Sequence, residues 1–251
     1  MKRTYYFKLL GLFGVIVLMT SCGLYRNRIQ PEKDTQEIKR LLEHIEKQNR
    51  SILSLKGIGK VSSRGLSNNN MNERVAFLAQ QPDRLRIEIL GPFGPLIRFS
   101  TDGEWVYFTH QMMKKVYKKK ASASIFRRYL PIPLIPSDVI DLLSGRIPIQ
   151  AHQYVEVERQ PNEKVLSLYK TFGLCQKIYI QKNDQVRAFE VFNTFGRLEY
   201  GVELKDYKRI QNYWIPNQII VNDSSKGKCT LLIQSYEPNN SIDLEQFSIQ
   251  K

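Results

Sequence analysis

Apolar and polar residues alternate with a period of two along most of the chain after residue 57. Such alternation is typical of strands with one buried and one exposed face. Turn signals at 67–70, 81–83 and 102–103 separate the first of these segments. The predicted strands form a first series (58–61, 74–79, 85–90, 96–99, 104–108 and 115–117) and a second (153–159, 165–172, 176–181, 187–192, 201–204, 219–221 and 231–236).

Two segments instead show helical spacing. Between Thr35 and Lys56 the apolar residues fall on one helical face, and Gly57 follows as a stop signal. Between Pro136 and Gly145, a proline start and a glycine end bound a short amphipathic helix. Hairpin series with few helices predict a mainly β fold, in which a strongly curved antiparallel sheet buries the helices on its concave face. The alternative for the helix predicted at 35–56 is that it lies on a membrane surface or binds a partner instead of packing on the sheet.

The N-terminus has the features of an export signal. A basic start precedes a short apolar run, 9–19, which is shorter than the roughly 20 residues that a transmembrane helix needs. Thr20-Ser21-Cys22 then resembles the lipobox of bacterial lipoproteins, although Met19 stands where leucine is usual. That resemblance implies a signal peptide at 1–21, acylation of Cys22 and a lipid-anchored tether at 22–34. In some lineages an aspartate after the acylated cysteine retains lipoproteins in the inner membrane. Gly23 stands at that position here, which favours the outer membrane. For the N-terminus as a whole, an ordinary signal peptide without acylation is the alternative.

The charge balance indicates which partners to expect. The chain carries 38 Lys+Arg against 24 Asp+Glu, a formal charge of +14. This favours anionic membrane surfaces, lipopolysaccharide or an acidic protein, and an exported chain is a poor candidate for nucleic acid. The densest basic patch comprises Lys114, Lys115, Lys118, Lys119 and Lys120. It is either a binding surface or a solvated loop.

No motif for catalysis is recognisable. The three histidines are isolated, and the chain lacks a zinc-protease motif, a nucleophile elbow and a phosphate loop. We therefore expect no enzyme, no catalytic residues, no metal and no cofactor. Cys175 and Cys229 both fall in predicted strands, and the sequence leaves open whether they form a disulfide.

The segment Gly91-Pro92-Phe93-Gly94 joins two predicted strands. Prolines fix φ and glycines permit positive φ, so the segment suits a defined turn. Phe93 is either presented at the tip, where it can enter a bilayer or a partner's groove, or packed back onto the core.

Together these features resemble the LolA/LolB-like superfamily, and within it the outer-membrane lipoprotein receptor LolB. The resemblance rests on Gly91-Pro92-Phe93-Gly94, the proline-rich apolar stretch 130–136, and the helix followed by Gly145-Arg146-Ile147-Pro148. It implies an unclosed β-barrel over 35–251 with a helical lid and an apolar cavity for lipoprotein acyl chains. Pro92, Phe93 and Gly94 then form the membrane-insertion loop. The long C-terminal part, the basic run and Phe93 in place of leucine depart from the family pattern.

The expected function is transfer without a chemical step. The protein would face the periplasm from the outer membrane as a monomer, bind acyl chains, and receive cargo from a carrier resembling LolA. The alternative is a non-catalytic envelope-assembly lipoprotein that binds a protein or glycan and has a filled interior. Which alternate residues of each strand face the cavity depends on the strand's register. In one of the two possible arrangements, the cavity is lined by Ile87, Ile89, Phe99, Trp105, Tyr107, Ile140 and Leu143.

Overall fold

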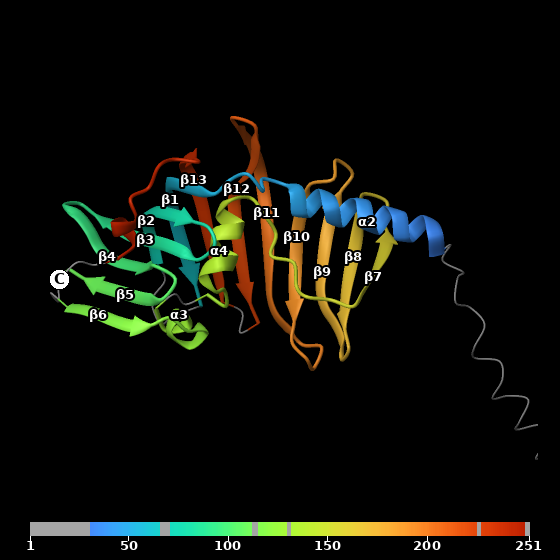
Figure 1. The fold of residues 1–251 in the computed structure, drawn as a ribbon, viewed down its shortest axis with the longest axis horizontal. Coiled ribbons are helices and arrows are strands. Elements are labelled where there is room, and N and C mark those ends of the chain that lie inside the picture. Colours follow the sequence, from blue (N-terminus) through green and yellow to red (C-terminus); the bar gives the residue numbers. More distant parts are fainter. Residues whose placement is uncertain (1–30, 66–70, 112–114, 130–131, 225–226, 249–251) are drawn as a thin grey trace, which may run out of the picture. The chain divides into compact units, whose positions relative to one another are not determined.

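The computed structural model describes residues 31–65, 71–111, 115–129, 132–224 and 227–248 (Figure 1). It forms two compact units, Met1–Gln36 and Glu37–Lys251, and the second contains the whole sheet. The predicted signal peptide 1–21, the acylation site Cys22 and residue Lys114 lie outside the described residues. The predicted tether lies outside them too, except that helix α2 (Pro31–Lys47) already begins within it.

The second unit is built on one antiparallel sheet of 13 strands, ordered β6-β5-β4-β3-β2-β1-β13-β12-β11-β10-β9-β8-β7. In the part of the chain that is described, the end strands β6 and β7 do not pair, so the sheet is not closed into a barrel. This confirms the predicted mainly β, unclosed fold. The strands are β1 (Ser54–Arg64), β2 (Met71–Gln80), β3 (Arg84–Gly91), β4 (Gly94–Thr101), β5 (Trp105–His110), β6 (Lys115–Lys120), β7 (Tyr154–Arg159), β8 (Glu163–Lys170), β9 (Gly173–Gln181), β10 (Val186–Phe192), β11 (Leu198–Ile210), β12 (Tyr213–Asp223) and β13 (Lys228–Pro238).

The remaining elements are α2, α3 (Ala123–Tyr129), α4 (Pro136–Leu143) and a final 3-10 turn, η1 (Leu244–Phe247). Figure 1 shows α4 and the part of α2 that belongs to the second unit on the same side of the sheet. Their apolar residues, including Leu41, Ile45 and Ile140, join the inward-facing strand residues in one core. The predicted burial of helices against the sheet is therefore what the second unit shows.

The predicted helix at 35–56 is too long. It ends at Lys47, Asn49 has a positive φ of 52°, and Leu55 already belongs to β1. Ile52 lies in the connecting segment, where it is fully buried. Both Ile52 and Leu55 satisfied helical spacing because a few buried residues at a helix-to-strand junction fit either period.

Ion pairs hold the helix to the hairpin loops at one edge of the sheet. Glu37 accepts hydrogen bonds from Arg159 at 2.5 Å and pairs with Lys164 at 3.0 Å, and Arg40 lies 2.8 Å from Asp184. Burial raises the pKa of Glu37, but the bonds from Lys164 and Arg159 outweigh it, so the net shift is downward. Because these groups are partly exposed, the pairs set orientation more than stability.

The end of α4 is fixed by a close approach to the segment after α2. The Asn49 side chain donates hydrogen bonds to the carbonyls of Ser144 (3.0 Å) and Trp214 (2.8 Å). Gly145 adopts φ +68°, and a Cβ there would lie 2.7 Å from the Asn49 amide nitrogen. The glycine after the helix is thus needed both for its conformation and for the contact that places α4 over the sheet.

Replacing Ile140 by alanine tests the packing of α4. Ile140 is 1% exposed, so we expect the free energy of unfolding to fall by about 2–5 kcal/mol in a urea titration. Leu53→Ala is the matched control: Leu53 is 63% exposed, and its loss should change stability by less than about 0.5 kcal/mol. Equal effects of the two substitutions would mean that α4 is not packed as described.

Candidate functional site

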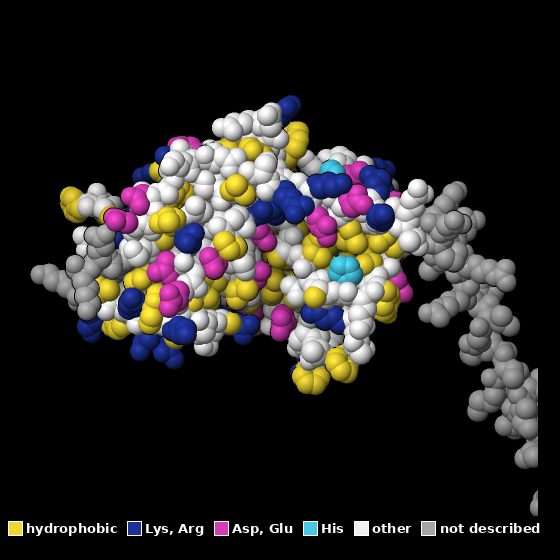
Figure 2. Space-filling view, viewed as in Figure 1, with side chains coloured by type: hydrophobic (Ala, Val, Ile, Leu, Met, Phe, Trp, Pro, Cys, Tyr) yellow, Lys and Arg dark blue, Asp and Glu magenta, His cyan; other side chains and the backbone are white. Residues whose placement is uncertain are grey.

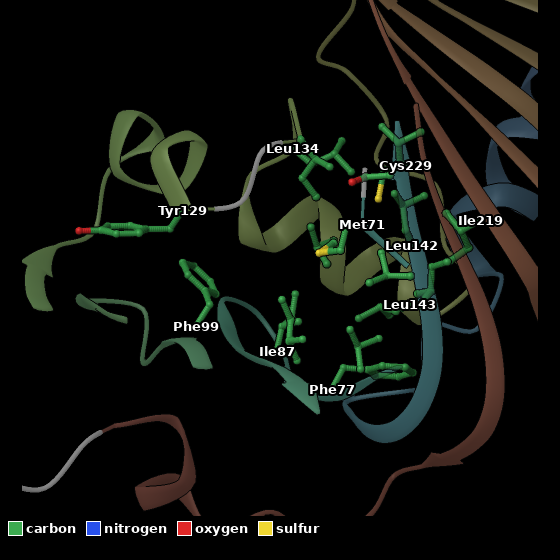
Figure 3. Close-up of a pocket in the computed structure, with 18 of the residues that line it drawn as sticks. Met71, Phe77, Ile87, Phe99, Tyr129, Leu134, Leu142, Leu143, Ile219 and Cys229 are labelled. Atoms are coloured by element: carbon green, nitrogen blue, oxygen red, sulfur yellow. The ribbon is translucent and has the colours of Figure 1, made fainter. Parts of the chain in front are cut away.

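A partly open apolar cavity lies on the concave side of the sheet beneath α4 (Figure 3). Its volume is about 320 Å³. Figure 3 shows Leu142 and Leu143 of α4 directed toward the strands that carry Phe77 and Ile219. The lining consists of Val61, Ser63, Met71, Val75, Phe77, Ile87, Ile89, Ile97, Phe99, Phe108, Tyr129, Ile132, Leu134, Val139, Leu142, Leu143, Ile219, Val221, Cys229 and Leu231.

The lining is hydrocarbon apart from the hydroxyls of Ser63 and Tyr129, the Cys229 thiol and the Met71 thioether. No charged side chain is among its described residues. Sites of this size and character accept small apolar ligands, whose surface replaces water in contact with the wall. A cavity with this lining suits a hydrocarbon chain.

Four of the residues proposed from sequence line this cavity: Ile87, Ile89, Phe99 and Leu143. Trp105 and Tyr107 do not, because the register of β4 and β5 pairs Phe99 with Phe108. Directly opposed residues share a face, so Phe108 points into the cavity and its neighbour Tyr107 points out. The strand parity assumed for β5 was therefore wrong by one residue.

On the outer face, Trp105 and Tyr107 meet polar partners. The Tyr107 hydroxyl donates a hydrogen bond of 2.9 Å to Asp102, and the Lys118 ammonium lies 4.4 Å from the centre of the Trp105 ring. Ile140, the remaining proposed residue, is buried in the core but is not part of the cavity wall. It lies on the helix α4 one residue from Val139, which does line the wall.

Sequence reasoning missed the part of the wall formed by β1, β12 and β13. Val61, Ile219 and Leu231 line the cavity from these strands, as does Cys229. Each lies in an alternating segment, and that pattern is the signal available in the sequence. The alternation does not show that β13 pairs with β1, which is what brings these side chains to one surface.

Phe93 lies at the tip of the β3–β4 hairpin. Gly91 pairs with Gly94, so Pro92 and Phe93 form a two-residue turn, and Gly94 has φ +128°. The Phe93 side chain is fully exposed. Of the two alternatives, the structure therefore presents the ring to the outside. At the base of the same hairpin, Ile89 pairs with Ile97, and both line the cavity.

The basic run forms the end strand β6, in which all six residues are exposed. Lys118 and Lys120 pair with Tyr107 and Trp105 and share their outer face, whereas Lys119 pairs with Val106. The lysines are thus divided between both faces of a strand and do not form a loop. Lysines on an end strand also prevent unwanted pairing with another sheet.

The two described cysteines are free. Cys175 is in β9 and Cys229 in β13, with β10, β11 and β12 between them. Four strand spacings of about 4.8 Å place them roughly 19 Å apart, too far for a disulfide. Burial raises the pKa of the Cys229 thiol to about 11.

The described residues contain no group of three or more His, Cys, Asp or Glu side chains arranged to hold a metal ion. On α4, burial raises the pKa of Asp138 and of Asp141, but Asp141 is paired with Arg146 at 2.9 Å. Neither carboxylate lines the cavity. Among these residues no helix has both the length and the apolar character to span a membrane.

The open antiparallel sheet with its covering helices resembles the fold of several solved structures. A LolA superfamily protein from Nitrosomonas europaea superposes with a TM-score of 0.59 at 13% identity, covering 84% of this chain and 97% of its own. A domain assigned to outer membrane lipoprotein sorting, from Vibrio parahaemolyticus, gives 0.54 at 12% identity, covering 86% and 96%. A DUF1329 family protein from Desulfovibrio piger gives 0.59 at 9% identity, covering 85% and 96%.

At these identities the likeness establishes a shared fold. No family model matches the sequence, and no curated protein matches it either. The chain thus has the LolA fold, as the resemblance implied, while the narrower likeness to LolB remains a prediction.

The raised pKa of Cys229 predicts slow alkylation that accelerates with pH. Only the thiolate reacts, and a pKa of about 11 leaves roughly a hundredfold less thiolate at pH 8 than a thiol with a pKa near 9. The alkylation rate of Cys229, followed by mass spectrometry, should therefore rise about tenfold per pH unit between pH 7.5 and 9.5. A rise of only about threefold between pH 8.5 and 9.5, as for a thiol with a pKa near 9, would show that the thiol is not buried in this wall.

Proposed function

We propose that this chain is a lipoprotein-binding protein of the outer membrane, anchored by acylated Cys22 and facing the periplasm. It takes up acyl chains of other lipoproteins and delivers them to the membrane without a chemical step. The observation that carries the proposal is the continuity between the apolar cavity and the Phe93 hairpin. Its fold, shared with a lipoprotein-sorting domain, supports the proposal, and so does the lipobox-like N-terminus.

Uptake depends on the hydrocarbon lining. At about 0.8 kcal/mol per methylene, burying some 15 methylenes contributes about 12 kcal/mol before ordering costs are counted. A chain held that strongly dissociates slowly into water, so transfer requires a route that keeps it out of water. The protein therefore needs a low-energy path from the cavity to the bilayer.

The β3–β4 hairpin provides that path. Ile89 and Ile97 pair at its base in the cavity wall, and Phe93 lies four residues beyond Ile89 at the exposed tip. At about 3.4 Å per residue this is roughly 14 Å. When Phe93 enters the lipid, the hairpin base is brought to the membrane surface, and a chain leaving the cavity meets hydrocarbon rather than water.

The alternative, an envelope-assembly module that binds a partner through its surface, predicts a filled interior. The cavity of about 320 Å³ does not agree with that expectation. The exposed lysines of β6 remain suited to an acidic carrier or to anionic lipid headgroups. In the proposed function these lysines attract a carrier protein resembling LolA to the receptor, which acts as a monomer.

Filling the cavity should abolish uptake. Val61→Trp places an indole in the cavity, whereas Ser62→Trp places it on the opposite, exposed face of β1. We expect photo-crosslinking of a lipopeptide with photoreactive acyl chains to fall at least tenfold in Val61→Trp and to be unchanged in Ser62→Trp. Undiminished crosslinking in a correctly folded Val61→Trp protein would refute the cavity as the binding site.

Phe93→Glu should separate transfer from uptake. A charged tip cannot enter the bilayer, so we expect normal lipopeptide binding and at least tenfold slower transfer to acceptor liposomes. Phe93→Leu should keep transfer. Leu53→Glu is the control, because Leu53 is another exposed apolar residue. If both glutamate variants slow transfer equally, the effect comes from surface charge in general and not from the Phe93 tip.

A further inference from the structure

The Phe93 turn is one of three similar turns in the described part of the sheet. Thr171-Phe172-Gly173 joins β8 to β9, and Thr194-Phe195-Gly196 joins β10 to β11. In each, a phenylalanine precedes a glycine with positive φ: +120° at Gly173 and +71° at Gly196. The rings of Phe172 and Phe195 are 82% and 86% exposed.

These two turns lie at the same edge of the sheet. The strands β8, β9, β10 and β11 are consecutive antiparallel neighbours, so the β8–β9 and β10–β11 turns emerge on one side (Figure 1). Two strand spacings place the turns about 10 Å apart. Figure 2 shows hydrophobic side chains at both turns. The two rings therefore project together, away from the cavity, to which β8–β11 contribute no lining residue.

Hydrogen bonds fix both turns in place. The Asn193 side chain accepts bonds from the backbone amides of Phe195 (2.9 Å) and Arg197 (3.1 Å). The Gln153 amide donates to the Thr171 hydroxyl at 2.9 Å. Exposed phenylalanines on such ordered turns lose little conformational entropy on binding, which is the property expected of an anchor.

Each ring has an exposed cation two residues away in the sequence, Lys170 before Phe172 and Arg197 after Phe195. Neither 170–173 nor 193–197 contains an acidic residue, and the exposed Glu199 follows two residues after Arg197. A phenylalanine ring with a nearby cation matches the interface of an anionic bilayer, because the ring enters the boundary between headgroups and acyl chains and the cation pairs with phosphate.

A protein partner fits these turns less well. Stable protein interfaces bury about 800 Å² on each side around a continuous apolar centre. Here two single rings stand about 10 Å apart on separate turns. Separate, projecting rings suit a fluid surface that closes around each of them.

We propose that Phe172 and Phe195, with Lys170 and Arg197, form a second membrane contact that binds an anionic lipid surface independently of the cavity and of Phe93. This contact orients the sheet on the membrane. It does not depend on acyl-chain uptake, so it can hold even if the proposed transfer function fails.

Lipid crosslinking in the full-length protein tests this contact. Photoreactive benzoylphenylalanine replaces Phe172, Phe195 or, as the control, Leu53, which is 63% exposed just before β1 at the opposite edge of the sheet. The proteins are reconstituted in phosphatidylcholine vesicles with or without phosphatidylglycerol. With phosphatidylglycerol present, positions 172 and 195 should form at least about ten times more lipid adduct than position 53.

Removing the cations should weaken the contact in a charge-dependent way. Lys170→Gln and Arg197→Gln should each lower the lipid adduct at 172 and 195 about fivefold in vesicles with phosphatidylglycerol, with little change in phosphatidylcholine alone. Phe172→Ser combined with Phe195→Ser should leave lipopeptide uptake unchanged. Equal adduct at positions 53, 172 and 195, or adducts with protein in place of lipid, would overturn the proposal.

Discussion

The pairing of the first strand with the last is the constraint on which the rest of the structure depends. β1 and β13 pair antiparallel from Leu55–Pro238 to Arg64–Lys228. One half of the sheet, β2–β6, extends from β1, and the other, β7–β12, extends from β13. Without this pairing the halves would be separate sheets, and Val61 would not face the cavity beside Leu231. The pairing joins residues far apart in the chain, so forming it has a large entropic cost of loop closure. That cost is offset only when the whole sheet forms.

The cavity follows from how the two halves are covered. One half is filled by the apolar face of α2, where Leu41 and Ile45 are almost fully buried. The other is covered by the shorter α4, which is held at its end by Asn49 and leaves a volume of about 320 Å³ unfilled. Unfilled apolar volume lowers stability, because its lining loses dispersion contacts. Its retention in a sheet of this size is reasonable if a ligand fills it.

The edges of the sheet carry two further surface features. Hairpin turns carry exposed phenylalanines, and the end strand β6, which pairs only with β5, carries lysines. Exposed apolar rings on ordered turns suit an interaction surface, whereas lysines on an end strand also prevent pairing with another sheet. The proposed functions place each of them at a membrane or carrier surface, while the concave side binds hydrocarbon. Apolar binding and surface recognition are thereby kept on different parts of one sheet.

Local patterns allowed several elements to be predicted from the sequence. The alternating segments became strands, the segment after Pro136 became α4, and Gly91–Gly94 became a tight turn. The sequence could not say that Trp105 and Tyr107 point outward, because their parity depends on the register of β5 against β4. Nor could it say that the first helix stops at Lys47, since Ile52 and Leu55 fit both periods.

The sequence by itself therefore determined the types of element, the turn that presents Phe93 and the absence of recognisable catalytic motifs, because these depend on residues close together in the chain. Only the tertiary structure decided that Val61 and Cys229 share a wall with Ile87, and that Phe172 and Phe195 project from one edge. The physical reason is that strand order, register and unfilled volume arise from contacts between residues that are distant in the sequence.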